Sequence, residues 1–229
     1  MADEFALQRA DSPARTLMVT GNRAGLIERG RKDLLNLTST ALYDKGEAFF
    51  SADGVPQDYT QAAFWFRKSA DQGNAYAQER LGLMYSVGWG VPENDVESAN
   101  WYRQAAEQGL ARAQYRLGDY YLYGIGVPKD PVGAIGWELR AAEQGYKSAQ
   151  RWLGIVYLKG IGVPSDPQEA YFWSYIAYEL HTAENGSVLA NSAARKRDKA
   201  ASFLTDEELT QTQERAKHWL ASHRINAGD

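Results

Sequence analysis

The chain has 229 residues, a formal net charge of −4, 44% hydrophobic residues and 24% charged residues. This composition is typical of a soluble globular protein, and the acidic balance argues against nucleic acid as a partner because it gives no general attraction to phosphate backbones. The absence of cysteine excludes disulfides, thiolate zinc sites and cysteine nucleophiles, and the sequence has no run of about 18 apolar residues that could span a membrane.

The N-terminal segment, residues 1–36, carries no repeat. Leu26, Ile27, Leu34 and Leu35 favour one capping helix near its end. The opening Met-Ala-Asp-Glu-Phe lacks the basic start and apolar stretch of a secretory signal, although such a start also fits a chain from which a signal has been removed. We expect a periplasmic or exported protein if a signal was removed, and a cytoplasmic one otherwise.

A period of 36 residues organises the chain from residue 37 to residue 184. Tryptophan, glycine and proline recur together at this step, which is the signature of a repeat architecture. The predicted units cover about 37–73, 74–109, 110–145 and 146–184. The recurring positions are Trp65, Trp101, Trp137 and Trp173; Gly54, Gly90, Gly126 and Gly162; and Pro56, Pro92, Pro128 and Pro164.

Each unit is predicted to be a pair of antiparallel helices joined by short connections. In the first helix, Ala77, Leu81 and Tyr85 share one face with small residues that permit close approach. A glycine then ends this helix in the left-handed conformation, and the Gly-Val-Pro connector cannot continue it. The second helix follows an N-cap residue. These N-cap residues are Asp58, Asn94, Asp130 and Asp166.

The first unit departs from the pattern at three positions. Lys45 stands where the other units have leucine, Phe49 replaces tyrosine, and Ala52 replaces the capping glycine. Alanine takes the left-handed conformation only at an energetic cost. We therefore expect the first helix of this unit to run on, or to end less sharply than the others.

The periodic tryptophans are predicted to lie in the core, because a helical pair cannot bury its apolar face alone and neighbouring units must stack. Trp89 and Trp152 lie outside the repeat signature, and we expect them to be partly exposed. The predicted fold is an all-α, right-handed α-solenoid superhelix of about four 36-residue helix-turn-helix repeats with N- and C-terminal capping helices.

Residues 185–229 are predicted to form the C-terminal cap. The second helix of the last unit lacks the Ala-Ala-Glu-Gln-Gly ending of the others, and we expect it to end near Asn185. Two further helices are predicted at about 188–203 and 206–222. The second of them opens with the capping box Thr-Asp-Glu-Glu.

The recurring residues resemble the Sel1-like repeat, a 36-residue relative of the tetratricopeptide repeat. The resemblance rests on Ala-Gln-x-x-Leu-Gly-x-x-Tyr, Gly-x-Gly-Val-Pro, and a tryptophan followed by Ala-Ala-Glu-Gln-Gly, and it covers about residues 38–184. It implies protein binding, with the first helix of each unit lining the concave surface. Bacterial proteins of this family serve as signalling regulators, as secretion or envelope scaffolds, and as immunity proteins that neutralise a toxic effector.

The sequence offers no constellation that supports catalysis, and we expect neither an enzyme nor a cofactor. The histidines, His181, His218 and His223, lack the spacing of a metal-binding pair. The Gly-x-Gly connectors follow a helix and meet a proline, unlike phosphate-binding loops. Glu207 and Glu208 lie at a helix start, where the helix dipole favours carboxylates without any catalytic role.

Partner binding is expected on the first helices, at positions that vary between units. Mixed aromatic, aliphatic and charged residues occupy these positions, as at interfaces, and Tyr115 and Tyr123 are the expected centre. The alternative is that Tyr115, Tyr123 and Leu83 pack on the adjacent first helix. The predicted row is Tyr43, Glu47 and Phe50; Glu79, Leu83 and Ser86; Tyr115, Asp119 and Tyr123; and Arg151, Ile155 and Lys159.

The leading hypothesis is a monomeric bacterial module that holds a protein partner as an inhibitor or adaptor. Its most specific form, implied by the resemblance, is an immunity protein that neutralises a secreted toxic effector, as in type VI secretion. The alternatives are an envelope signalling regulator or scaffold, a binding protein or enzyme for cell-wall carbohydrate or β-lactams, and a purely structural homo-oligomer.

Overall fold

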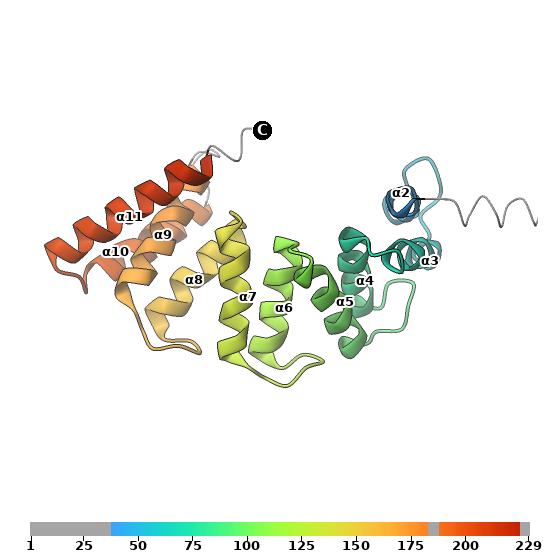
Figure 1. Ribbon diagram of the computed structural model, residues 1–229, viewed down its shortest axis with the longest axis horizontal. Coiled ribbons are helices and arrows are strands. Elements are labelled where there is room, and N and C mark those ends of the chain that lie inside the picture. Colours follow the sequence, from blue (N-terminus) through green and yellow to red (C-terminus); the bar gives the residue numbers. More distant parts are fainter. Residues whose placement is uncertain (1–37, 183–187, 225–229) are drawn as a thin grey trace, which may run out of the picture.

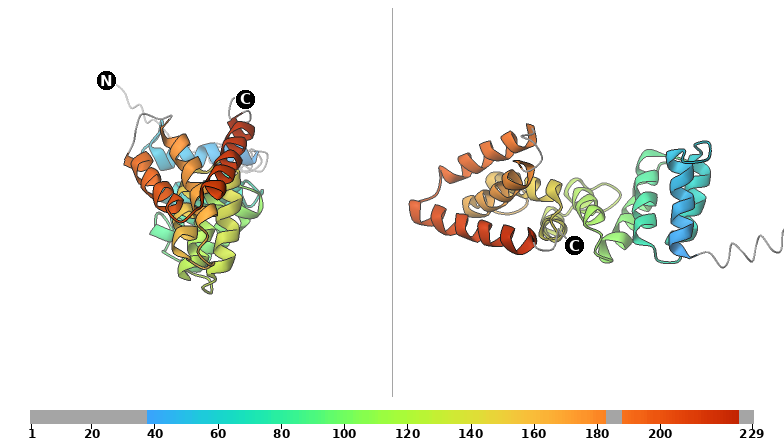
Figure 2. Two further views of the ribbon diagram at one scale, coloured as in Figure 1. Left: turned by 90° about the vertical axis from the view of Figure 1, so that its left-hand side faces the viewer. Right: turned by 90° about the horizontal axis from the view of Figure 1, so that it is seen from above.

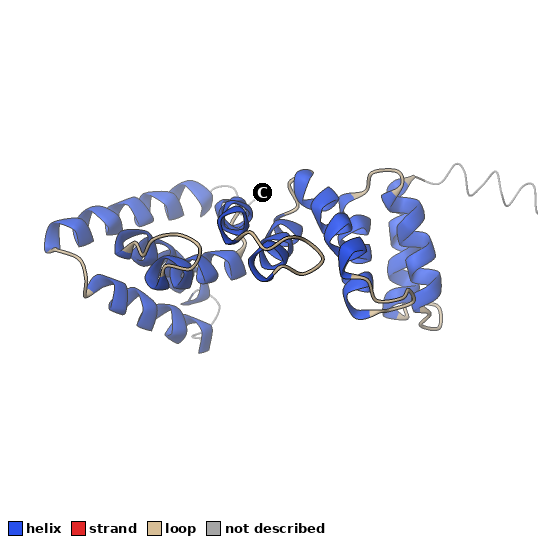
Figure 3. Cartoon of the chain, turned by 90° about the horizontal axis from the view of Figure 1, so that it is seen from below, coloured by secondary structure: helices blue, strands red, loops and turns tan. Residues whose placement is uncertain are grey.

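The computed structural model describes residues 38–182 and 188–224, and every regular element in these two ranges is an α-helix (Figure 3). The repeats contain α2 (Ser39–Ser51) and α3 (Tyr59–Ala70), α4 (Ala75–Val87) and α5 (Asp95–Glu107), α6 (Ala111–Tyr123) and α7 (Pro131–Glu143), and α8 (Lys147–Lys159) and α9 (Pro167–Thr182). The cap contains α10 (Val188–Ala201) and α11 (Asp206–Arg224). The N-terminal helix expected near Leu26 lies outside the described residues.

The helices follow one another along an arch, with α2 and α3 at one end and α9, α10 and α11 at the other (Figure 1). Each first helix packs against the second helix of its own repeat, and each second helix packs against the first helix of the next repeat. The predicted α-solenoid is confirmed. None of the described helices is both long enough and apolar enough to cross a membrane.

The predicted N-caps of the second helices are confirmed. The Asp58 carboxylate accepts the backbone N–H groups of Thr60 and Gln61 at 2.9 and 3.0 Å. Asn94 and Asp166 cap α5 and α9 in the same way, and Asp130 caps α7 by accepting the Gly133 N–H. Because these N–H groups have no partner inside the helix, the caps fix where each second helix begins.

A buried glutamine joins each second helix to the next repeat. Gln114 donates its amide N–H to the Ala106 carbonyl at 3.2 Å, and its side-chain oxygen accepts a hydrogen bond from Gln144 at 2.7 Å. Gln78 makes the equivalent contact with Gln108, also at 2.7 Å. The recurring Ala-Gln and Glu-Gln-Gly motifs are therefore the two sides of one buried hydrogen-bonding site.

The connectors of the second, third and fourth repeats each reach back to the preceding repeat through a glycine. Gly126 has a φ of +62°, and a Cβ atom there would overlap the Asp95 carbonyl oxygen at the start of α5. Gly90 and Gly162 lie against the starts of α3 and α7 in the same manner. The glycine is required both for the left-handed backbone and for this close approach.

The first repeat ends its first helix as sharply as the others do, so the expectation of a longer or less defined end was wrong. α2 has 13 residues, as α4 and α6 have. Ala52 adopts the left-handed conformation with a φ of 59°. Its N–H donates to the Ala48 carbonyl, so the capping hydrogen bonds outweigh the strain that a side chain brings to this conformation.

The periodic tryptophans divide into two pairs. Trp101 and Trp173 are buried, as predicted, whereas Trp65 and Trp137 are half-buried. Cations cover the second pair, with Lys45 4.6 Å from the Trp65 ring centroid and Arg140 4.7 Å from that of Trp137. Trp89 is partly exposed, as expected, and stacks on Tyr59 at 5.2 Å.

The two predicted C-terminal helices are present, and α9 lies between them (Figures 1 and 2). The capping box of α11 is formed, because the Thr205 N–H donates to the Glu208 carboxylate at 2.9 Å. Leu220 of α11 joins Trp173 in the core, and Arg215 pairs with Glu169 at the start of α9 at 2.7 Å. The cap therefore closes the last repeat. The predicted end of α9 near Asn185 falls outside the described residues.

The fold predicts opposite effects for two Gly→Ala substitutions that add the same methyl group. Gly126→Ala should lower the free energy of unfolding by more than about 1–2 kcal/mol, because it adds left-handed strain to a clash with backbone. Gly136→Ala, in α7, meets nothing within 4 Å and should raise it by about 0.5–1 kcal/mol. Urea unfolding measures both, and equal stability of the two variants would contradict the proposed role of the connector.

Candidate functional site

The predicted row lies on one layer of the solenoid, formed by α2, α4, α6 and α8. We call this layer the first-helix face. The contacts of its residues differ from one repeat to the next. Some of these side chains hold neighbouring repeats together, and others are exposed and available to a partner.

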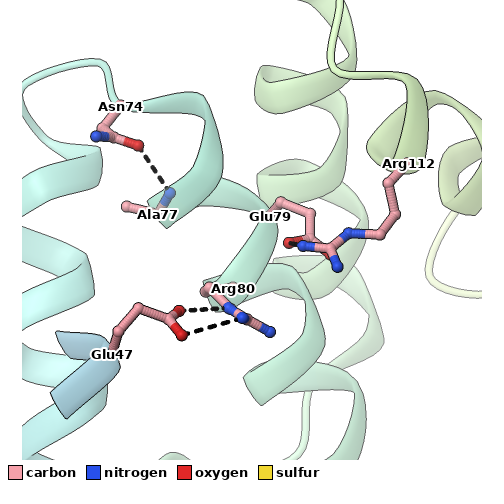
Figure 4. Close-up of polar contacts among 6 residues, drawn as sticks. All are labelled: Glu47, Asn74, Ala77, Glu79, Arg80 and Arg112. Atoms are coloured by element: carbon pink, nitrogen blue, oxygen red, sulfur yellow. Dashed lines mark hydrogen bonds and ion pairs between the residues drawn. The ribbon is translucent and has the colours of Figure 1, made fainter. Parts of the chain in front are cut away.

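Ion pairs between adjacent first helices occupy the two glutamates of the row (Figure 4). Both carboxylate oxygens of Glu47 bind the Arg80 guanidinium, at 2.6 and 3.1 Å. Glu79 pairs with Arg112 of α6. Glu79 is only 4% exposed, so it lies within the protein and not at the surface, where a partner would contact the predicted row. The reason is that each glutamate reaches an arginine 33 residues further on, in the next helix.

The aromatic residues of α2 also pack within the protein. The Tyr43 ring lies 5.6 Å from Phe66, and the Phe50 ring lies 5.7 Å from Trp89. Sequence reasoning missed Tyr76 at the start of α4, which is 57% exposed. Together with Tyr43 it lines a shallow hollow of about 550 Å³. Tyr76 lies just before the recurring Ala, Leu and Tyr positions of the first helix, so the 36-residue period alone did not predict its exposure.

The expected centre contains one packed and one exposed tyrosine. Tyr115 is half-buried, with its ring 5.4 Å from Tyr146, and burial, followed by the nearby carboxylates, raises its pKa to about 12. Leu83 is half-buried against the core beside Tyr102. Tyr123 is 62% exposed. The alternative to partner binding, that these side chains pack within the protein, therefore holds for Tyr115 and Leu83 and fails for Tyr123. Ser86 donates to the Leu83 carbonyl at 2.8 Å.

A buried carboxyl group lies beneath this centre. Glu138 of α7 is 0% exposed, and neither of its oxygens has a hydrogen-bond partner. Burial, followed by the charge of Asp119, raises its pKa to about 8. Burial also raises the pKa of Asp119, while Arg116 lowers it. Burial therefore holds Glu138 mainly in its neutral form near neutral pH, whereas Asp119 pairs with Arg116 at 3.9 Å.

The position of Glu138 explains its burial. In each repeat the second helix presents one side chain to a glycine of the first helix, and that glycine leaves room for it. Phe66, Tyr102 and Ser174 take this position in the other repeats, and Glu138 takes it in the third, against Gly118. Sequence reasoning missed Glu138, and the signal was a carboxylate in register with two aromatic residues.

Two of the three predicted residues of α8 are cations that find no ion-pair partner among the described residues. Arg151, Ile155 and Lys159 lie four residues apart and share one face of the helix. Arg151 and Ile155 are half-buried and Lys159 is exposed. Neither cation forms an ion pair in the described part of the chain, in contrast to the paired glutamates of α2 and α4.

The remaining polar side chains show structural contacts. Among the residues that the structure describes, no three histidines or carboxylates come together in a way that could hold a metal ion. The His223 ring stacks on Trp219 at 3.7 Å. The surface of α6 and α8 is therefore the part of the first-helix face that is most available for contact with another molecule.

Comparisons with known proteins agree with this architecture. A family model of the Sel1 repeat matches residues 39–74, 75–110, 111–146 and 147–181. The crystal structure of a Sel1 repeat protein from Oxalobacter formigenes is similar, with 30% identity and a TM-score of 0.66 over 91% of this chain and 83% of that chain. No curated protein matches the chain.

A second similar structure is that of a protective antigen present in uropathogenic Escherichia coli strains. It shares 29% identity with this chain and has a TM-score of 0.60. The similarity covers 82% of this chain and 46% of that chain, so this protein corresponds to about half of the antigen.

The buried carboxyl group predicts a pH-dependent stability. The pKa of Glu138 in the folded state, about 8, lies above its ordinary value of 4.5. The contribution of this raised pKa to the free energy of unfolding is therefore fully present below about pH 4.5 and is lost as the pH rises through 8. Relative to Glu138→Gln, the wild-type free energy of unfolding should fall by up to about 1.4 kcal/mol per pH unit between these limits.

Urea unfolding at a series of pH values measures this difference. Glu143→Gln is the matched control, because it removes an exposed carboxylate from the same helix and should keep the wild-type slope. Parallel curves for wild type and Glu138→Gln would show that Glu138 is not held in its protonated form.

Proposed function

The chain belongs to the Sel1 repeat family, and from this premise we propose that it binds a protein partner through the first-helix face of α6 and α8. Sel1-repeat proteins are generally protein–protein interaction modules. The observation that carries the proposal is Tyr123, a large aromatic side chain 62% exposed on the same face as Arg151 and Lys159 of α8, which form no ion pair with a described residue.

The two halves of the face differ in what they leave available. On α2 and α4, the row is occupied by the Glu47–Arg80 and Glu79–Arg112 ion pairs. On α6 and α8, the row offers Tyr123, the half-buried Ile155 and two cations. Tyrosine and arginine are preferred anchors of protein interfaces because they combine apolar area with directed polar groups. These features support the second half as the contact surface.

Capture of partners by the full chain tests the proposal. Tyr123→Ala should weaken partner binding by roughly tenfold or more, the effect of losing an interface anchor, while thermal stability stays unchanged because Tyr123 is exposed. Phe64→Ala is the control, because it removes an exposed aromatic ring from α3 in the other layer. A protein retained by wild type and Phe64→Ala, and lost by Tyr123→Ala, is the expected partner.

If every captured protein is retained equally by wild type and Tyr123→Ala, the first-helix face of α6 is not the interface. Where a partner is identified, isothermal titration against the three purified chains measures the affinities directly.

The finer form of the proposal is that the partner is a toxic secreted effector and that the chain is its immunity protein. What supports it is the family resemblance together with a short arch whose middle carries an exposed aromatic side chain, a surface suited to covering one compact protein. Expression of the partner alone should then arrest bacterial growth. Co-expression of wild type should restore growth, and co-expression of Tyr123→Ala should not.

A partner that leaves growth unaffected when expressed in each cell compartment would exclude the immunity role. The broader proposal of protein binding would still stand in that case, and an adaptor or scaffold would be the remaining form.

A further inference from the structure

α10, which lies outside the repeats, adds two cations to the first-helix face. It packs against α8 as well as against α9, and α11 lies on the other side of α9 (Figure 2). Lys196 of α10 lies close enough to Arg151 and Lys159 of α8 for their charges, with that of Arg195, to lower its pKa after the larger effect of burial. These four residues define the cationic end of the first-helix face.

The described residues supply no ion-pair partner for this cationic end. Within residues 38–182 and 188–224, none of its four side chains forms an ion pair, and Lys196 instead donates to the Ser192 hydroxyl at 2.7 Å. Other cations of the same region are neutralised. Arg197 pairs with Asp198 at 2.8 Å, and Arg215 pairs with Glu169. Like charges held together raise the free energy of the unbound protein, which an anionic ligand would lower.

We propose that the cationic end receives an acidic segment of the partner protein, whose glutamate or aspartate side chains enter between α8 and α10. This inference rests on the proposed function and adds the chemistry of the partner to it. Arg151 and Arg195 each present a planar guanidinium that binds a carboxylate through two parallel hydrogen bonds. Carboxylates between the helices would also screen Lys196 from its neighbours.

The surroundings favour a polypeptide over other polyanions. Ile155 lies between Arg151 and Lys159 on the same face of α8, and Arg151 is close enough to Tyr115 to affect its pKa. Apolar side chains between cations suit a segment in which acidic and apolar residues alternate. Long polyanions bind through many phosphate contacts, whereas the cationic end offers four cations.

Fluorescence anisotropy with the full chain tests the inference. The probe is a labelled short peptide of alternating glutamate and leucine. A single-stranded oligonucleotide and phosphatidylglycerol vesicles serve as competing classes of anion. The peptide should bind, and should bind less tightly as salt rises from about 50 to about 500 mM. The double variant Lys159→Gln/Arg195→Gln should bind it about fivefold less tightly, the loss expected from two exposed charge contacts.

The control is Lys68→Gln/Lys129→Gln, which removes the same charge from exposed positions on α3 and on a connector and should keep wild-type affinity. The inference is overturned if the peptide does not bind, if both double variants bind it equally, or if the oligonucleotide or the vesicles bind more tightly through the same two residues.

The two proposals fail in different ways. If the partner identified through Tyr123 is retained at full strength by Lys159→Gln/Arg195→Gln, the acidic-segment inference is wrong while partner binding stands. If no protein depends on Tyr123, the proposed interface on α6 is wrong, and the peptide titration still reports on the cationic end by itself.

Discussion

Close approach of two helices at a position without a side chain is the constraint on which this molecule depends. In each repeat a glycine of the first helix faces one side chain of the second helix, and a methyl group on Gly82 would lie 2.8 Å from the Tyr102 ring. Helices that approach this closely bury their apolar stripes efficiently. A hairpin of two such helices still leaves one side uncovered, so the next repeat must complete it.

This constraint also determines what lies under the first-helix face. The side chain that faces the glycine passes between the helices of the first layer. Its chemical type differs from repeat to repeat, whereas the backbone stays the same. A Tyr102 ring there gives an apolar filling, whereas Glu138 brings a carboxyl group to the underside of Tyr115 and Asp119. The first-helix face therefore differs between repeats in its exposed side chains and also in the buried side chains beneath them, whereas the solenoid backbone stays the same.

The sequence period was sufficient to predict the solenoid and the N-caps, because both depend on local rules repeated every 36 residues. The cap helices lie outside the period, and the capping box of α11 was the local signal for the start of the second. It was insufficient for Glu79, whose burial depends on an arginine from another helix. It was also insufficient for Ala52, where the capping hydrogen bonds at the end of α2 prevail over residue preference. The contribution of α10 to the face was missed for a similar reason, since periodicity assigns residues to a helical face but does not position a helix outside the repeats.

The connectors have a consequence for how the chain is made. Gly126 of the third repeat lies on the start of α5 in the second, so the second helix of each unit is completed by residues that leave the ribosome later. The last such helix, α9, has no following connector, and α11 serves instead through the contacts of Glu208 with Gln168 and of Arg215 with Glu169. Folding during synthesis would then proceed one unit behind translation, and the nascent arch would stay open at its growing edge until α11 emerges.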